Sequence, residues 1–292
     1  LAAGRPGRAD RRHRRLLPAR HHGLDQGEMA GALRPQGRGC THGSQGGGAM
    51  TEALLEVTGV SKAFGGVVAN HDISLKVPAG SITGLIGPNG SGKTTLFNSI
   101  VGYHPIDAGS IQFEGQEISH LRVLEIARSG MLRTFQQTRI YKKMTCVQNM
   151  LISRPTRDEG MWSLFSAFQR EDTERAEGLL EFVGLFSKRH LMAGDLSFGQ
   201  QKLLEFAMAL MNGPKLLLLD EPTAGINPTL INGLIDRLKR ANADLGITLF
   251  VIEHNMRVIM NLAQHIYCLA HGELLAEGAP EQIQNDQRVI DA

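Results

Sequence analysis

The chain has 292 residues, 42% of them hydrophobic and 21% charged, which is enough for one large domain or two modest ones. An aromatic content of 5% with 34 glycines is typical of a turn-rich globular protein and excludes a fibre or a coiled coil. No apolar run approaches the roughly 18 residues that a membrane-spanning helix needs, so we do not expect the chain to cross a bilayer. Cys40, Cys146 and Cys268 are far apart and form no CxxC pattern, which favours a reducing compartment without a disulfide framework or a zinc site.

Residues 1–49 differ from the rest of the chain in charge and composition. They hold nine arginines against three acidic residues, whereas residues 50–292 carry a small negative net charge. They are also rich in glycine and poor in β-branched residues, which predicts disorder. One hypothesis is an arginine arm for nucleic acid or anionic lipid. The other, which we favour, is a non-native extension, because Met50 opens the first well-patterned segment.

From Met50 onward, apolar patterns predict alternating strands and helices. The predicted strands are residues 54–60, 73–77, 82–87, 110–113, 216–219, 248–252, 265–269 and 273–276. The predicted helices are residues 93–101, 161–168, 171–183, 201–211, 230–241 and 255–262. Alternation of this kind with continuously apolar strands predicts an α/β fold with a parallel sheet covered on both faces. A helical insertion at about 142–205 interrupts the alternation.

A glycine-rich loop between a predicted strand and a predicted helix fits the phosphate-binding pattern GxxxxGK[ST]. Its residues are Gly87, Pro88, Asn89, Gly90, Ser91, Gly92, Lys93 and Thr94. The glycines allow backbone N–H groups to turn inward and form an anion nest, and the helix N-terminus adds its dipole. We predict that Lys93 reaches the β- and γ-phosphates, that Thr94 binds Mg²⁺, and that Thr95 lies close to the α-phosphate.

A second motif follows the apolar run Leu216–Leu219. Asp220 and Glu221 come directly after this predicted strand, at the edge where parallel sheets place ligands. Alone, an apolar run followed by two acids is a weak signal. Together with the Lys93 loop it predicts nucleotide hydrolysis, with Asp220 holding Mg²⁺ through water and Glu221 orienting and deprotonating the attacking water.

Five further segments, in the right order, resemble motifs of the ATP-binding-cassette (ABC) ATPases over roughly residues 54–280. They are an aromatic A-loop residue (Phe64), a Q-loop (Phe135-Gln136), a signature (Leu196-Ser197-Phe198-Gly199-Gln200), a D-loop (Ala224–Pro228) and a switch histidine (Val251–His254), besides the acidic pair. Four positions depart from the common pattern. They are Phe64, Phe198, Asn227 and Asn255, where tyrosine, glycine, aspartate and aspartate are commoner.

The variants LSFGQ and AGxNP resemble the branched-chain amino acid transporter group, and the match looks closest to the longer of its two ATPase subunits. Three other runs carry the same resemblance: Gly65–Ala69, Arg133–Gln136 and Gly278–Ile283. The resemblance implies a P-loop NTPase cassette with a parallel-sheet core, an antiparallel N-terminal β-subdomain and an inserted helical subdomain.

The resemblance also implies roles for the remaining motif residues. Phe64 would stack on adenine, His254 would contact the γ-phosphate, and Gln136 would reach metal and water. A second ATP-binding subunit, packed head to tail, would cover the nucleotide with Ser197, Gly199 and Gln200. Its identity stays open between a second copy and a companion ATPase, the latter being what the family suggests.

The resemblance implies a peripheral ATPase on the cytoplasmic face of a bacterial inner membrane, bound to transmembrane permease subunits and served by a periplasmic binding protein. The helical insertion would contact the permeases. Its apolar residues Trp162, Leu164, Phe165 and Phe168 would form part of a docking groove or, the blander alternative, the core of the lobe.

Two other functions fit the sequence less well than an importer subunit. A soluble cassette ATPase acting on DNA or ribosomes usually carries coiled-coil insertions or two cassettes, and neither is visible, so nucleic acid is not expected. A non-hydrolytic interaction module is opposed by the presence of Lys93, Asp220, Glu221 and His254 together. Branched-chain amino acids as cargo, rather than urea or another amide, rest on the resemblance alone.

Overall fold

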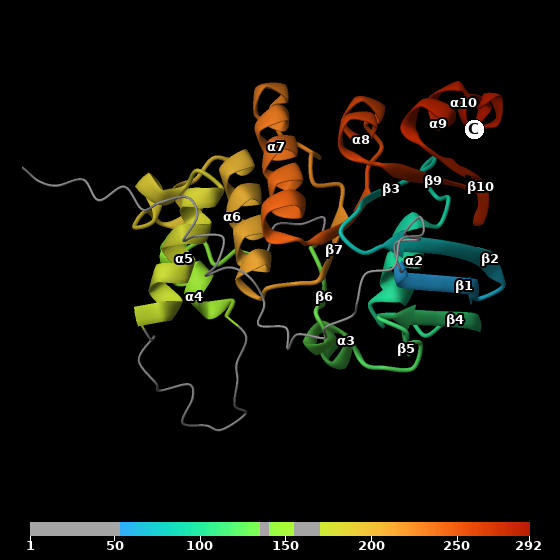
Figure 1. The fold of residues 1–292 in the computed structure, drawn as a ribbon, viewed down its shortest axis with the longest axis horizontal. Coiled ribbons are helices and arrows are strands. Elements are labelled where there is room, and N and C mark those ends of the chain that lie inside the picture. The colour runs from blue at the N-terminus through green and yellow to red at the C-terminus, as the bar shows by residue number, and fades with distance from the viewer. Residues whose placement is uncertain (1–52, 135–139, 155–169) are drawn as a thin grey trace, which may run out of the picture.

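The computed structural model describes residues 53–134, 140–154 and 170–292. This part of the chain contains two sheets flanked by helices. Figure 1 shows strands β1 (Ala53–Phe64), β2 (Val67–Pro78) and β4 (Ala108–Phe113) at one end of the molecule and helices α4 (Cys146–Ile152), α5 (Arg170–Phe182) and α6 (Phe198–Met211) at the other end. The larger sheet lies between these ends.

The larger sheet has six strands in the order β10-β9-β3-β8-β7-β6. Their bounds are β3 Ile82–Ile86, β6 Met131–Arg133, β7 Leu216–Asp220, β8 Thr248–Ile252, β9 His265–Ala270 and β10 Glu273–Gly278. Five strands are parallel, and β10 is an antiparallel edge strand. The carboxyl ends of the five parallel strands therefore meet at one edge, as the alternating pattern predicted.

The central strands are apolar at every position because both faces of the sheet are covered. In β7, Leu217 and Leu219 join a core cluster with the helices around α7, whereas Leu216 and Leu218 join a second cluster with the antiparallel sheet and α2. All five residues of β7 are buried. A continuous apolar run in a parallel sheet is the expected consequence of burial on both sides.

The smaller sheet is antiparallel, in the order β2-β1-β4-β5. Its strands are β1 Ala53–Phe64, β2 Val67–Pro78, β4 Ala108–Phe113 and β5 Gln116–Glu117. The turn between β1 and β2 is Gly65-Gly66, and both glycines have positive φ. Tyr267 on β9 joins the two sheets, since its hydroxyl accepts from the Lys76 N–H and donates to the Lys76 carbonyl, both at 3.0 Å.

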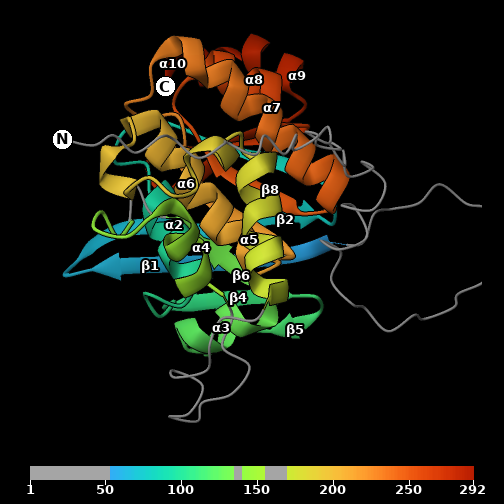
Figure 2. The ribbon, with the colours of Figure 1, turned by 90° about the vertical axis from the view of Figure 1, so that its left-hand side faces the viewer.

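Helices cover the parallel sheet and form a separate lobe. They are α2 Lys93–Ile100, α3 Val123–Ser129, α4 Cys146–Ile152, α5 Arg170–Phe182, α6 Phe198–Met211, α7 Pro228–Leu245, α8 Met256–Leu262, α9 Pro280–Asn285 and α10 Gln287–Asp291. Figure 2 shows α8, α9 and α10 on one side of the molecule and α3 with β4 and β5 on the opposite side. None of the helices in the described ranges is long and apolar enough to cross a membrane.

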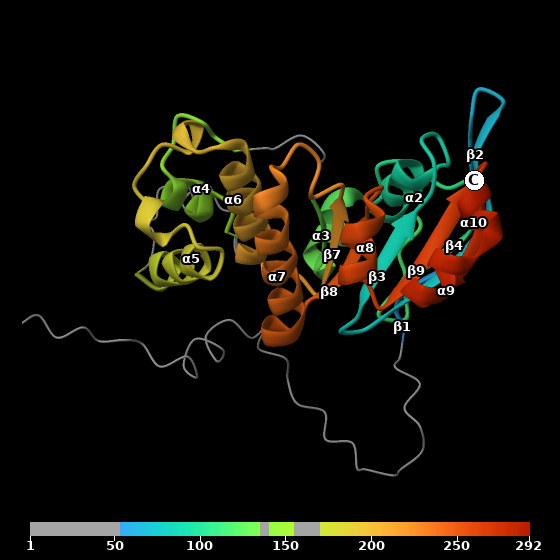
Figure 3. The same cartoon turned by 90° about the horizontal axis from the view of Figure 1, so that it is seen from above.

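Helices α4, α5 and α6 form the helical lobe, which Figure 3 shows beside α7. Their buried residues belong to the same core cluster as the α7 face of the sheet. The helix predicted over 161–168, with Trp162, Leu164, Phe165 and Phe168, lies outside the described residues.

The fold confirms the predicted parallel core, the antiparallel sheet and the helical insertion. Several details differ, and strand β5 and helices α3, α9 and α10 were not predicted. Strands β1 and β2 are each 12 residues long and exceed the predicted 54–60 and 73–77. Strand β6 was missed, because three residues are too few to show a period. Helix α6 begins at Phe198 instead of residue 201 and ends at Met211, as predicted.

Candidate nucleotide-binding site

The predicted site residues gather where neighbouring parallel strands end. The glycine-rich loop follows β3, His254 follows β8, and Asp220 ends β7. These strands are adjacent in the order β3-β8-β7, and Ile252 is in register with both Leu85 and Asp220. Parallel pairing therefore brings to one edge three motifs that are far apart in the sequence.

The glycine-rich loop approaches its neighbours too closely for any side chain at two positions. A Cβ on Gly87 would lie 2.0 Å from the Leu269 carbonyl oxygen, and a Cβ on Gly92 would lie 2.3 Å from the Ala69 carbonyl oxygen. Both residues also have positive φ, 142° and 96°. The Asn70 side chain donates to the Gly92 carbonyl at 3.1 Å and so ties the loop to β2.

Helix α2 begins directly after this loop with no side-chain cap. Gly92 is the N-cap residue, and the first turn carries no acidic residue. The N-terminal amides of a helix without a side-chain cap are satisfied by water or by a ligand, and they favour an anion. Thr94 and Asn89 are exposed here, Thr95 is half-buried, and Ser91 is buried. The loop therefore suits a phosphate group on the predicted residues.

The Lys93 ammonium lies inside the curl of the loop. Its Nζ donates to the carbonyl oxygens of Gly87 and Pro88, both at 2.8 Å, and to the Ser91 hydroxyl at 3.3 Å. Burial lowers the pKa of Lys93, although the charges of Glu221 and Asp220 oppose this shift. The cation is thus held at the loop by groups that phosphate oxygens can replace.

The Asp220 carboxylate is paired with Arg133. The sequence indicated no role for Arg133 beyond its place in the family-like run Arg133–Gln136. Arg133 Nη2 lies 2.6 Å from Asp220 Oδ2, and only 6% and 5% of the two side chains are exposed. Arg133 Nη1 also donates to Asn98 Oδ1 on α2 at 2.5 Å. Arg133 ends β6, so this ion pair joins β6, β7 and α2.

Glu221 has an unusual backbone conformation next to the ion pair. Its φ is 49°, in the left-handed region, and its N–H donates to the Ile252 carbonyl at 3.0 Å. Glu221 Oε1 lies 3.6 Å from His254 Nδ1. The two predicted catalytic side chains therefore come together, the histidine more exposed (58%) than the glutamate (21%).

Ser197, Gly199 and Gln200 form the N-terminus of α6. The Ser197 hydroxyl accepts from the Gln200 N–H at 3.4 Å, and the Gln200 side-chain oxygen accepts from the Ser197 N–H at 3.1 Å. This reciprocal capping box explains why the helix starts three residues earlier than predicted, and the pattern Ser-x-x-Gln was its signal in the sequence. Phe198, at the common glycine position, lies against Gly225 of the D-loop, where an added Cβ would come within 3.0 Å of the ring.

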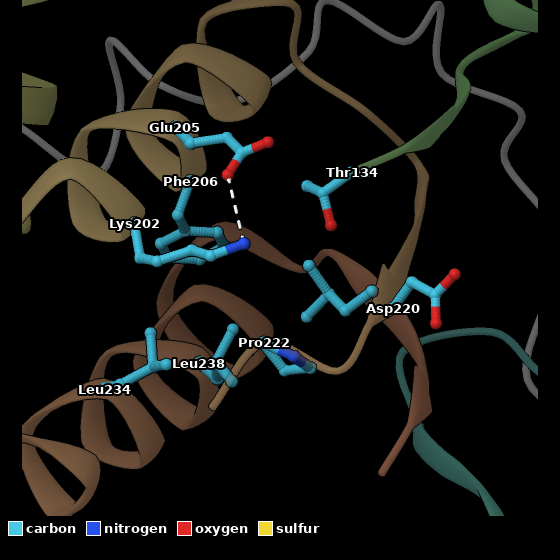
Figure 4. A pocket seen from close by; sticks show the side chains of 9 residues that line it. Thr134, Lys202, Glu205, Phe206, Asp220, Pro222, Leu234 and Leu238 are labelled. Carbon is cyan, nitrogen blue, oxygen red and sulfur yellow. Dashed lines mark ion pairs between the residues drawn. The ribbon is translucent and has the colours of Figure 1, made fainter. Parts of the chain in front are cut away.

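A small cavity of about 20 Å³ separates the start of α6 from the end of β7, large enough for about one water molecule. Figure 4 shows Lys202 and Glu205 of α6 on one side of it and Thr134 and Asp220 on the other. Lys202 Nζ lies 3.6 Å from Glu205 Oε2, and both side chains are nearly buried. The Asp220 carboxylate points away from this pair (Figure 4).

Phe64 ends β1 and is 44% exposed. Its ring meets His104 edge-on at a centroid distance of 5.2 Å, and Lys62 Nζ lies 5.3 Å from its centroid. An exposed aromatic face of this kind suits the predicted contact with adenine. Gln136, by contrast, lies outside the described residues.

The residues that would hold the implied magnesium ion are oxygen donors. Within the described ranges, no three His, Cys, Asp or Glu side chains are grouped to hold a metal. The Thr94 hydroxyl and the Asp220 carboxylate are hard oxygen donors of the kind Mg²⁺ takes, and this ion is usually bound by one or two protein groups together with phosphates and water. The residues fit an ion that arrives with nucleotide.

Family profiles match two parts of the chain. The ABC transporter profile matches residues 70–224, and the profile of the branched-chain amino acid ATP-binding cassette transporter matches residues 273–292. The chain belongs to the ABC transporter family as an ATP-binding cassette. Of the three motifs at the edge of the parallel sheet, the glycine-rich loop and Asp220 lie within the first match and His254 lies beyond it.

Relatives and solved structures agree over the same region. The high-affinity branched-chain amino acid transport ATP-binding protein BraF of Pseudomonas aeruginosa is 39% identical over 83% of this chain and 98% of its own length. The corresponding protein LivG of Escherichia coli K12 is 36% identical with the same coverage. A nucleotide-free ATP-binding cassette from an ABC transporter superposes with a TM-score of 0.74 at 36% identity, covering 82% of this chain and 98% of that one. An ATP-binding cassette in its ADP conformation gives a TM-score of 0.75 at 35% identity, with the same coverage.

Proposed function

We propose that the chain is the ATP-binding and ATP-hydrolysing subunit of a branched-chain amino acid importer. The observation that carries the proposal is the meeting of the Lys93 loop, the Asp220–Glu221 pair and His254 at adjacent strand ends. The names of the relatives support the cargo, because the chain covers nearly their whole length.

The backbone of the loop and the α2 N-terminus would bind the phosphates. Lys93 would exchange its contacts with Gly87 and Pro88 for phosphate oxygens, at little cost because the ammonium is already desolvated. The Thr95 hydroxyl would lie near the α-phosphate, and Phe64 would stack on the base. Thr94 and Asp220, with Gln136, would hold magnesium, which when bound offsets phosphate charge.

Glu221 would act as the general base on the attacking water. Its carboxylate is partly exposed beside His254, so both side chains can reach a water molecule and a γ-phosphate that enter from solvent. His254 would contact the γ-phosphate and keep it in line with that water. The protein supplies positioning and charge stabilisation, the main needs of phosphoryl transfer.

A second ATP-binding subunit would complete the site. Ser197, Gly199 and Gln200 lie at a helix N-terminus, a position that favours the phosphate of a nucleotide bound to the opposite protomer. The helical lobe would contact transmembrane permease subunits on the cytoplasmic face, and a periplasmic binding protein would deliver the cargo to them. Residues 1–49 would lie outside the ATP-binding domain at 50–292.

Two measurements test the proposal. Purified wild-type protein should bind Mg-ATP in a calorimetric titration, and Lys93→Ala should lose that binding while keeping a cooperative melting transition. Co-expression with permease subunits of a branched-chain amino acid importer should then give a detergent-stable complex whose ATPase activity rises with leucine-loaded binding protein. Stimulation by urea or an amide instead would overturn the cargo but not the ATPase function.

A further inference from the structure

Arg133 occupies an unusual place for a buried cation, against the carboxylate proposed to hold magnesium. Its guanidinium donates to Asp220 Oδ2 at 2.6 Å and to Asn98 Oδ1 at 2.5 Å. The ring of Phe97, fully buried, lies 5.7 Å from its Cζ. Among the described residues, Asp220 of β7 and Asn98 and Phe97 of α2 thus contact the guanidinium.

Stability alone is a weak reason for such a pair. Burying two charges costs desolvation energy that their attraction roughly returns, so well-packed apolar residues of similar size usually serve as well. The pair also stands at the end of β6, where Arg133 is in register with Leu218 and the Thr134 N–H continues the pairing to the Leu218 carbonyl. Backbone pairing therefore already holds β6 in the sheet. The buried guanidinium of Arg133 must have a purpose other than fixing this strand.

The charges at the strand ends explain why a cation is placed beside Asp220. Asp220 and Glu221 place two carboxylates at the end of β7, and both interact electrostatically with Lys93. Arg133 adds a second cation in direct contact with Asp220. Within the described residues, Lys93 and Arg133 are thus two cations near these carboxylates, and His254 lies 3.6 Å from Glu221. Removing Arg133 would leave the negative charge of these carboxylates less offset, and this would strengthen their attraction for a free divalent cation.

We propose that Arg133 is a positioning residue that acts as a built-in counter-ion of Asp220 and keeps divalent cations from the site until nucleotide brings its own negative charge. The inference rests on the proposed function. Arg133 would make metal binding follow nucleotide binding, so that the ion arrives at a site with phosphate oxygens in place. Asn98 and Phe97 keep the guanidinium at the carboxylate.

Mn²⁺ binding to the nucleotide-free protein tests this, measured at pH 8 from the electron paramagnetic resonance signal of the free ion. Wild type, Arg133→Lys and the surface control Arg122→Gln should bind no more Mn²⁺ than Asp220→Asn. Arg133→Gln should bind one Mn²⁺ per chain with an affinity at least about tenfold higher than wild type, as expected from removing a unit charge beside the ligand. The double variant Arg133→Gln/Asp220→Asn should lose this gain.

Equal Mn²⁺ binding by Arg133→Gln and wild type, with both folded, would overturn the proposal. If Arg133→Gln does not fold, wild type against Asp220→Asn still decides: nucleotide-free wild type that binds Mn²⁺ through Asp220 would overturn it. A separate titration of wild type with Mn-ATP reports on the proposed function. Failure of wild type to bind Mn-ATP would contradict the proposed function. Normal Mn-ATP binding, with equal Mn²⁺ binding by nucleotide-free Arg133→Gln and wild type, would contradict only the counter-ion role of Arg133.

Discussion

Glu221 carries its side chain on a left-handed backbone, with a φ of 49°. A non-glycine residue in this region costs on the order of 1 kcal/mol, and such strain persists where the surrounding structure enforces it. The Glu221 N–H donates to the Ile252 carbonyl at 3.0 Å and continues the pairing of β7 with β8. The bend turns the glutamate out of the strand direction and toward His254.

Glu221→Gln should keep Mg-ATP binding and slow hydrolysis by about 10²–10⁴-fold, because glutamine preserves the shape but cannot accept the proton. Isothermal titration and steady-state phosphate release measure the two effects. Glu273→Gln, at an exposed carboxylate paired with His71, is the matched control and should change neither. Turnover of Glu221→Gln near the wild-type rate would mean that another group activates the water.

The stability of a Gly87→Ala variant shows how strictly the loop requires glycine at this position. Gly87→Ala places a Cβ 2.0 Å from the Leu269 carbonyl oxygen and should lower the free energy of unfolding by on the order of 4 kcal/mol. Gly90 also has positive φ, but a Cβ there meets nothing within 4 Å, so Gly90→Ala should cost only about 1–2 kcal/mol. Urea denaturation compares the two, and equal losses would show that φ alone, without the close approach, sets the requirement.

Among the structural elements, α7 and α8 explain two departures from the common family pattern. Asn227 caps α7, where its Oδ1 accepts from the Thr229 N–H at 3.1 Å and from the Thr229 hydroxyl at 2.9 Å. Asn255 caps α8 in the same way through the Arg257 N–H at 3.1 Å. Asparagine and aspartate are nearly equal as N-caps, so either residue starts these helices.

Asn227→Ala should destabilise the protein by about 1 kcal/mol through loss of the α7 cap, and Asn227→Asp should be close to neutral. Thermal and urea unfolding measure this. Asn232→Ala, at an exposed position within α7, is the control and should stay within about 0.5 kcal/mol of wild type. A loss for Asn232→Ala as large as that for Asn227→Ala would rule out capping as the cause.

At the scale of the whole molecule, the glycine-rich loop and Ser197 of one protomer belong to different parts of the fold. The loop belongs to the end of β3, whereas Ser197 begins α6, the helix that joins the helical lobe to the core. A proposed head-to-tail dimer brings the Ser197 of one protomer to the loop of the other. Dimer formation would then depend on nucleotide.

Ser197→Arg should leave ATP affinity of the monomer unchanged, abolish ATP-dependent dimerisation and reduce hydrolysis to background, because a long cation replaces a small hydroxyl at the proposed interface. Light scattering after size-exclusion chromatography, in the Glu221→Gln background that retains ATP, measures the dimer. Ser197→Ala controls for the lost helix cap and should still dimerise. Loss of ATP binding by monomeric Ser197→Arg would mean that Ser197 acts within its own chain.

Much of this protein followed from local patterns. The sequence predicted the strand, glycine-rich loop and helix around Lys93, the buried strand that ends at Asp220, and the helical insertion. These features were predictable because backbone sterics and apolar periodicity act over a few residues. The position of strand β6, the Arg133–Asp220 pair and the start of α6 were not predicted. A three-residue strand has no period, and an ion pair between residues 133 and 220 exists only once β6 lies beside β7. Short local motifs therefore identified the functional residues from the sequence alone. The ion-pair partner of each charged residue was decided by the tertiary structure, because parallel strand pairing brings distant strand ends to one edge.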